Sequence, residues 1–120
     1  MEKMEKNPDV GVIVIEGARY DLPKKDFLER IQIEAKNKKV TIIVDEITSG
    51  WRMTPAGVYQ SFDFDPDMVV YGKALGNGFA ISAVVGKKDI MDASQDTFIS
   101  STMWTERVGF AAGIATLDKL

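Results

Sequence analysis

The stretch VTIIVDE, residues 40–46, is an apolar and largely β-branched run that ends in two carboxylic acids. Such a run is typical of a strand buried on both faces of a parallel sheet. A second run of the same kind, VGVIVI, covers residues 10–15. Between the two, Phe27, Leu28, Ile31 and Ala35 recur at helical spacing, which predicts a helix over about 23–38. Strand, helix and strand in this order predict a βαβ unit with parallel strands.

The residues after this unit extend the same architecture. MVVY, residues 68–71, predicts a third strand, and ISAVVG, residues 81–86, predicts a fourth. A short helix is expected over 88–93 and a final helix over about 105–119, whose predicted packing residues are Val108, Ala111, Ala112, Ala115 and Leu117. The fold class is therefore α/β with a mostly parallel sheet. Because parallel sheets need both faces covered, so few helices indicate either self-association or a piece of something larger.

Composition excludes several classes of function. The 120 residues carry a formal charge of −3, which argues against nucleic-acid binding. With no cysteine and no histidine, disulfides, thiolate metal sites, a cysteine nucleophile and a Ser-His-Asp triad are excluded. No apolar run is long enough to span a membrane and no signal peptide is recognisable, so we expect a cytoplasmic protein without membrane contact. An acidic segment from Asp63 lacks the glycine and glutamate of a calcium loop, and we expect no bound metal.

One pair of residues survives as a candidate site. Asp45 closes one predicted strand, and Lys73 follows the next. Ligands of open α/β sheets bind outside the carboxyl ends of the strands, so the two side chains are placed to face one crevice. A lysine beside an apolar run is expected to be partly desolvated, which lowers its pKa and frees a nucleophilic amine. The alternative is that Asp45 caps a neighbouring loop while Lys73 extends into solvent.

Three ordered blocks carry a resemblance to a known family. They are VDEITSGWR at 44–52, DPDMVVYGKALGNGFAISAVVGKKDIM at 65–91 and FISSTMWTERVGFAAGIATL at 98–117. Together they resemble class III pyridoxal-phosphate (PLP) aminotransferases, and within them the glutamate-1-semialdehyde 2,1-aminomutase-like branch. The resemblance implies part of a fold type I large domain, PLP as cofactor, a small-molecule amino donor and carbonyl acceptor, and a homodimer in the full-length enzyme. Residues 1–120 are then expected to be a partial PLP-binding large domain, without the upstream phosphate-binding part of the site and the C-terminal small domain.

The resemblance also implies roles for individual residues. Lys73 matches the lysine that forms a Schiff base with the cofactor, and Asp45 matches the partner of the pyridine nitrogen. Ile47 stands where the family packs a branched residue against one face of the ring, and Thr48 stands where some members place a glutamine near the phenolic oxygen. Ser101 and Thr102 match the segment that reaches the phosphate of a neighbouring subunit. Without the resemblance, Ile47 is an ordinary strand-end residue, and the two hydroxyls are common before a helix.

The expected function is amino-group transfer, by an aminotransferase or aminomutase, through a Schiff base on Lys73. The isolated chain is expected to be inactive, because the rest of the site would come from another chain or a longer form. Two alternatives stay open: a non-catalytic or self-associating fold that keeps only the scaffold, and a phosphate- or nucleotide-binding module that uses the turn around Gly76 and Gly78.

Overall fold

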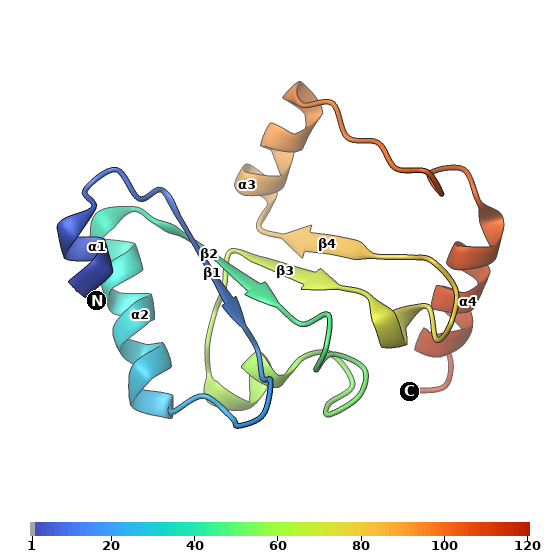
Figure 1. Ribbon diagram of the computed structural model, residues 1–120, viewed down its shortest axis with the longest axis horizontal. Helices are drawn as coiled ribbons and strands as arrows, with labels where there is room; N and C mark the ends of the chain where they lie inside the picture. The colour runs from blue at the N-terminus through green and yellow to red at the C-terminus, as the bar shows by residue number, and fades with distance from the viewer. Residues whose placement is uncertain (1) are drawn as a thin grey trace.

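A four-stranded mixed sheet forms the centre of the molecule in a computed structural model, which describes residues 2–120. The strands are β1 (Val12–Glu16), β2 (Thr41–Asp45), β3 (Met68–Tyr71) and β4 (Ala83–Gly86), in the order β1-β2-β3-β4 (Figure 1). The first two pairs are parallel, and only β4 runs antiparallel to its neighbour. The predicted α/β class and mostly parallel sheet are therefore confirmed.

Helices flank this sheet, and the molecule is flat, with extents of 44 × 35 × 21 Å. In Figure 1, α1 (Glu2–Lys6) and α2 (Lys25–Lys38) lie at one side and α4 (Arg107–Leu117) at the other, while α3 (Lys88–Asp92) follows β4. Three short 3₁₀ turns complete the chain: η1 (Val58–Phe62), η2 (Lys73–Leu75) and η3 (Ala93–Asp96). Each predicted element exists, with bounds within about two residues of expectation. No helix within residues 2–120 combines the length and apolar character needed to cross a membrane.

The main core lies between α2 and the sheet. Three of the four residues predicted at helical spacing, Leu28, Ile31 and Ala35, are the buried face of α2 and pack with β2. The fourth, Phe27, is 51% exposed, so its expected place on the packing face is wrong. Burying each large aliphatic side chain contributes roughly 1.5–3 kcal/mol. The contact between α2 and β2 therefore fixes the βαβ unit that carries Asp45 at its end.

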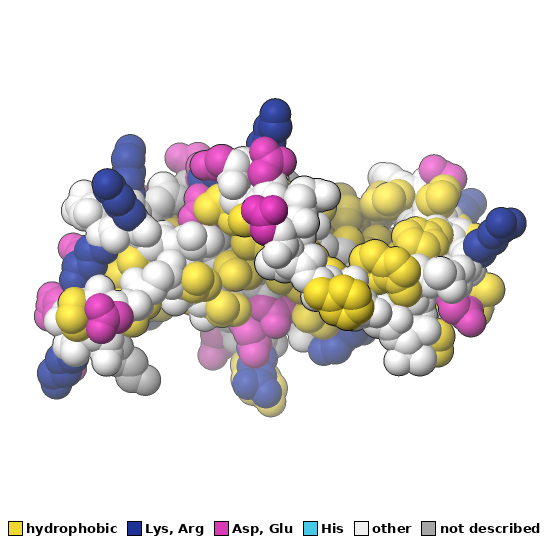
Figure 2. Space-filling view, turned by 90° about the horizontal axis from the view of Figure 1, so that it is seen from above, with side chains coloured by type: hydrophobic (Ala, Val, Ile, Leu, Met, Phe, Trp, Pro, Cys, Tyr) yellow, Lys and Arg dark blue, Asp and Glu magenta, His cyan; other side chains and the backbone are white. Residues whose placement is uncertain are grey.

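The expectation that the first strand is buried on both faces is wrong for this chain. β1 is an edge strand, and Val12 and Val14 are 51% and 63% exposed. β2 alternates between buried and half-buried residues, and most of β4 is exposed. Apolar side chains also gather over the segment between α3 and α4 (Figure 2), where Phe98 is 95% exposed. One face of the sheet and this segment thus present apolar surface to solvent.

The packing face of α4 also differs from expectation. Its buried residues are Gly109 and Gly113, whereas the predicted packing residues are exposed, except for the half-buried Ala112. A Cβ on Gly109 would lie 2.6 Å from the carbonyl oxygen of Ala80, so only glycine permits this close approach. The face of α4 that packs against the rest of the molecule is therefore its glycine face, with the closest backbone approach at Gly109, and not the face of its larger aliphatic residues.

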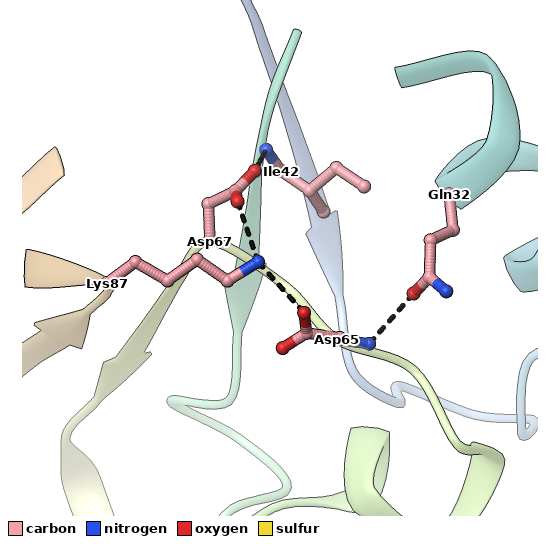
Figure 3. Close-up of polar contacts among 5 residues, drawn as sticks. All are labelled: Gln32, Ile42, Asp65, Asp67 and Lys87. Carbon is pink, nitrogen blue, oxygen red and sulfur yellow. Dashed lines mark hydrogen bonds and ion pairs between the residues drawn. The ribbon is translucent and has the colours of Figure 1, made fainter. Parts of the chain in front are cut away.

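A polar cluster lies where β3 begins and β4 ends (Figure 3). Lys87, directly after β4, lies 2.9 Å from Asp65 and 3.0 Å from Asp67. Asp67 also accepts the backbone N–H of Ile42 at 2.8 Å, and Gln32 of α2 accepts the backbone N–H of Asp65 at 2.8 Å. The acidic segment that resembles a calcium loop is thus used to join β4, β2 and α2.

Candidate functional site

A cavity of about 430 Å³ opens at the carboxyl ends of the parallel strands. β1 ends at Glu16 and β2 at Asp45, which are register partners, and Lys73 follows β3 after one glycine. The lining residues are Glu16, Arg19, Tyr20, Asp45, Ile47, Thr48 and Lys73. Asp45 and Lys73 thus line one cavity, as the strand-end argument predicts.

The turn after β2 orients the carboxylate of Asp45. Its Oδ1 accepts the backbone N–H of Ile47 at 2.8 Å, and its backbone carbonyl accepts the N–H of Gly17 at 2.9 Å. The first bond sets the rotation of the carboxylate, and the second holds the end of β2 against the residues that follow β1. Asp45 is half-buried, so the carboxylate remains accessible from the cavity.

Lys73 reaches the same turn from the neighbouring strand. Its Nζ donates to Oγ1 of Thr48 at 2.9 Å. The side chain is nevertheless exposed, so the expected desolvation of this lysine is wrong for this chain. Its backbone adopts φ 43°, a left-handed conformation that a residue with a side chain rarely takes. An exposed primary amine is therefore held over a carboxylate-lined cavity by a hydroxyl and by a constrained backbone.

Two buried groups, the phenol of Tyr71 and the carboxyl group of Glu46, lie close in sequence to the cavity residues Lys73 and Asp45. Burial raises the pKa of the Tyr71 phenol above its ordinary value of 10.0, and the hydrogen bond and charge of Tyr59 and the charge of Glu46 act in the same direction. The Tyr71 ring packs against Trp51 with centroids 5.3 Å apart. Because Tyr71 is the last residue of β3, this packing fixes the point from which Gly72 and Lys73 leave the sheet.

Ser101 and Thr102 lie elsewhere. They line a separate groove of about 740 Å³, together with Ile81, Trp104 and Phe110 among others. The structure brings together four of the six predicted site residues, Asp45, Ile47, Thr48 and Lys73, and does not bring Ser101 and Thr102 into their cavity. The role of these two at the phosphate of a neighbouring subunit stays a prediction.

Three cavity residues were not predicted as site residues: Glu16, Arg19 and Tyr20. Glu16 carries a signal that would have found it, because it ends β1 beside Asp45 and obeys the same strand-end rule. Arg19 and Tyr20 lie on the exposed loop after β1, where Arg19 stands 3.8 Å from Glu16 and 5.6 Å from the centre of the Tyr20 ring. No periodicity or strand end marks these two in the sequence.

Comparison with known proteins agrees with this geometry. The profile of the family described as aminotransferase class-III matches residues 2–120. The chain belongs to the class-III aminotransferase family. Among curated members, it is 35% identical to glutamate-1-semialdehyde 2,1-aminomutase of Nitrosopumilus maritimus, covering 98% of this chain and 29% of that protein. It is 36% identical to 3-aminobutyryl-CoA aminotransferase of Cloacimonas acidaminovorans, covering 98% of this chain and 30% of that protein.

Two solved structures superpose well on the chain. The ornithine aminotransferase of Toxoplasma gondii ME49 matches with a TM-score of 0.84 and 28% identity, over 98% of this chain and 29% of that one. The FumI protein of Sphingopyxis sp. MTA144, in its PLP internal aldimine form, matches with a TM-score of 0.89 over 98% of this chain and 30% of that one. At 23% identity, the second likeness shows the fold alone. The chain spans about 30% of the length of the curated relatives it matches.

Proposed function

We propose that this chain is part of a PLP-dependent enzyme of amino-group transfer, and that Lys73 is its Schiff-base lysine. The observation that carries the proposal is the shared cavity of Asp45 and Lys73 at the carboxyl ends of β1 and β2 in a class-III aminotransferase chain. Residues 1–120 would form part of the PLP-binding large domain. The relatives include an aminomutase and an aminotransferase, so the reaction is either exchange between an amine and a carbonyl compound or a shift within one molecule.

The residues of the cavity fit the chemistry of PLP. A carboxylate suits a protonated pyridine nitrogen, and a primary amine suits the cofactor aldehyde. Asp45 keeps Oδ2 for such a partner, because Oδ1 is engaged by Ile47. Ile47 supplies an apolar side chain and Thr48 a hydroxyl in the same cavity. Asp45, Ile47, Thr48 and Lys73 are therefore the residues that would hold the cofactor.

The chain's own residues would divide the work of the reaction. Bound PLP supplies an electron sink for the carbanion formed at the substrate. Lys73 would hold the cofactor covalently and then carry the proton that moves on the substrate carbon, with Thr48 Oγ1 as the hydrogen-bond acceptor that orients its Nζ. Asp45 would keep a proton on the pyridine nitrogen by its negative charge. These roles need no histidine or cysteine, and the chain has neither.

Residues outside this chain would complete the active enzyme. We propose that the isolated 120 residues do not turn over, because the chain spans about 30% of its curated relatives. In the assembled enzyme, a homodimer, Ser101 and Thr102 would bind the phosphate at the neighbouring subunit's site. Their separation from the Lys73 cavity suits such a role.

The experiment is reductive trapping. Incubation of the chain with PLP, followed by borohydride and peptide mass spectrometry, should place the label on Lys73. Lys73→Ala should lose the label, and Lys88→Ala, an exposed lysine remote in sequence, should keep it. Labelling spread over many lysines, or unchanged in Lys73→Ala, would contradict the proposal.

A second candidate is a non-catalytic, self-associating fold. The observation that favours it is the exposed apolar surface of β1 and α4, including Val14, Phe110 and Ile114. Concentration-dependent dimers in analytical ultracentrifugation, together with no PLP uptake at Lys73, would support it over the first proposal.

A further inference from the structure

Glu46 is a buried acidic residue that the proposed reaction does not use. It follows Asp45 directly and is 0% exposed. Within residues 2–120, no lysine or arginine forms an ion pair with it. Its carboxyl group instead accepts the hydroxyl of Ser49 and, at 3.0 Å, the backbone N–H of Tyr59. Burying a carboxyl group without a cation is costly unless such donors replace water, so its presence calls for a physical reason.

Two glycines leave space for the side chain of Glu46. A Cβ on Gly17 would lie 2.4 Å from its Oε1, and a Cβ on Gly57 would lie 3.0 Å from its carboxyl carbon. Two glycines, one after β1 and one before η1, therefore make room for this carboxyl group. Because those segments are far apart in sequence, Glu46 connects both of them to the end of β2.

The backbone of Glu46 starts the turn that carries the predicted cofactor residues. Its N–H donates to the carbonyl of Val70 on β3 at 2.9 Å, and its own carbonyl accepts the N–H of Gly50 at 2.8 Å. The turn between these two bonds contains Ile47, which fixes Asp45, and Thr48, which accepts from Lys73. A displacement of Glu46 would therefore move the groups on both sides of the cavity.

We propose that Glu46 is a positioning residue, whose buried carboxyl group fixes the 46–50 turn so that Asp45 and Thr48 face Lys73. The inference rests on the proposed function in so far as Asp45, Thr48 and Lys73 are taken to hold the cofactor. The rigidity of the turn itself is a property of the chain without cofactor. Hydrogen bonding to Ser49 and Tyr59 supplies the rigidity, and an acceptor in the right place is what the turn requires. Glutamine keeps such an acceptor, whereas methionine keeps the length of the side chain and removes both oxygens.

The test compares Glu46→Met and Glu46→Gln with Leu28→Ala, a substitution in the main core between α2 and the sheet. Amide hydrogen exchange is measured without cofactor at residues 47–50 and Tyr59, relative to Ile42 and Val44 in β2. Glu46→Met should accelerate exchange in the turn about tenfold relative to β2, and Glu46→Gln should restore most of the protection. Leu28→Ala should change turn and strand alike. PLP trapping at Lys73 should fall with Glu46→Met and recover with Glu46→Gln.

The outcomes separate this inference from the proposed function. Unchanged turn protection in Glu46→Met, or a Glu46→Gln variant no better than Glu46→Met, would overturn the positioning role. If the wild-type chain captures no PLP, the proposed function fails for it, while the exchange measurement still decides the role of Glu46. If Glu46→Met does not fold, Ser49→Ala removes one donor and should loosen the same turn; unaltered protection there would also overturn the inference.

Discussion

At the scale of single residues, the backbone of Lys73 is the feature that sequence reasoning could not supply. Its φ of 43° lies in the left-handed region, where a side chain costs roughly 1–2 kcal/mol. Strain of this kind concentrates at functional sites, because the surroundings hold a side chain where the reaction needs it. In this chain the hydrogen bond to Thr48 holds the amine at the cavity. The local conformation is thus consistent with selection for the position of the amine rather than for stability.

The strain gives a prediction for two substitutions at this position. Lys73→Gly should be more stable than Lys73→Ala by about 0.5–1 kcal/mol, because alanine keeps the left-handed penalty and glycine removes it, less the entropy that glycine gains in the unfolded chain. Urea unfolding of both variants measures the difference. Ala74→Gly, at a residue of ordinary φ in the same turn, should instead lose about 0.5–1 kcal/mol. Equal stability of the two Lys73 variants would mean that the backbone relaxes without the lysine.

At the scale of elements, the seating of α4 depends on one glycine contact. Gly109→Ala should destabilise the chain by about 1–3 kcal/mol, since the added Cβ would meet the Ala80 carbonyl at 2.6 Å and force the helix away from the turn before β4. Gly113→Ala is the matched control. Its Cβ would lie 3.4 Å from Ile81, an ordinary contact, and alanine favours the helix, so stability should stay level or rise by up to about 1 kcal/mol. Thermal unfolding compares the stability of the two variants. Similar losses of stability in both would refute a specific need for glycine at position 109.

The same helix shows where sequence patterns stop predicting packing. Spacing finds the helix, because apolar residues recur along it, but it assigns the packing face to the larger residues such as Val108 and Leu117, which are about half exposed. Close backbone approach selects glycine, which periodicity counts as neutral. For β1 the error has another cause: a continuous apolar run predicts burial on both faces, while coverage of Val14 depends on which segments lie nearby.

At the scale of the whole molecule, topology explains how much of the site was predictable. The order of strand and helix places Asp45 and Lys73 at one edge of the sheet, so their shared cavity follows from the sequence. The presence of Arg19 in the cavity depends on the path of an exposed loop. The carboxyl group of Glu46 is held by hydrogen-bond donors 3 and 13 residues further along the chain, Ser49 and Tyr59. Neither is encoded in local pattern. The strand ends were therefore predictable, and the contacts that hold them were not.

The cluster of Lys87, Asp65 and Asp67, at the end of the sheet away from the cavity, makes the stability of the whole sheet depend on pH. Hydrogen bonds to Asp65 and Asp67 raise the pKa of Lys87 above its ordinary 10.5, so the folded state holds this proton more tightly than the unfolded state. The stabilisation is complete below pH 10.5 and is lost as the pH rises through the raised pKa. The Lys87 side chain is 43% exposed, so solvent screening limits the contribution to about 0.5 kcal/mol.

Lys87→Met should therefore lower the free energy of unfolding by about 0.5 kcal/mol at pH 8, and the gap to wild type should close above the raised pKa. Urea unfolding at pH 8, 10 and 11.5 measures the difference in free energy of unfolding between the variant and wild type. Groups that ionise in both proteins cancel in this difference. Lys88→Met, one residue along and outside the cluster, should show no such closure. A gap for Lys87→Met that stays constant to the highest pH would show that the lysine acts through packing of its aliphatic chain rather than through its charge.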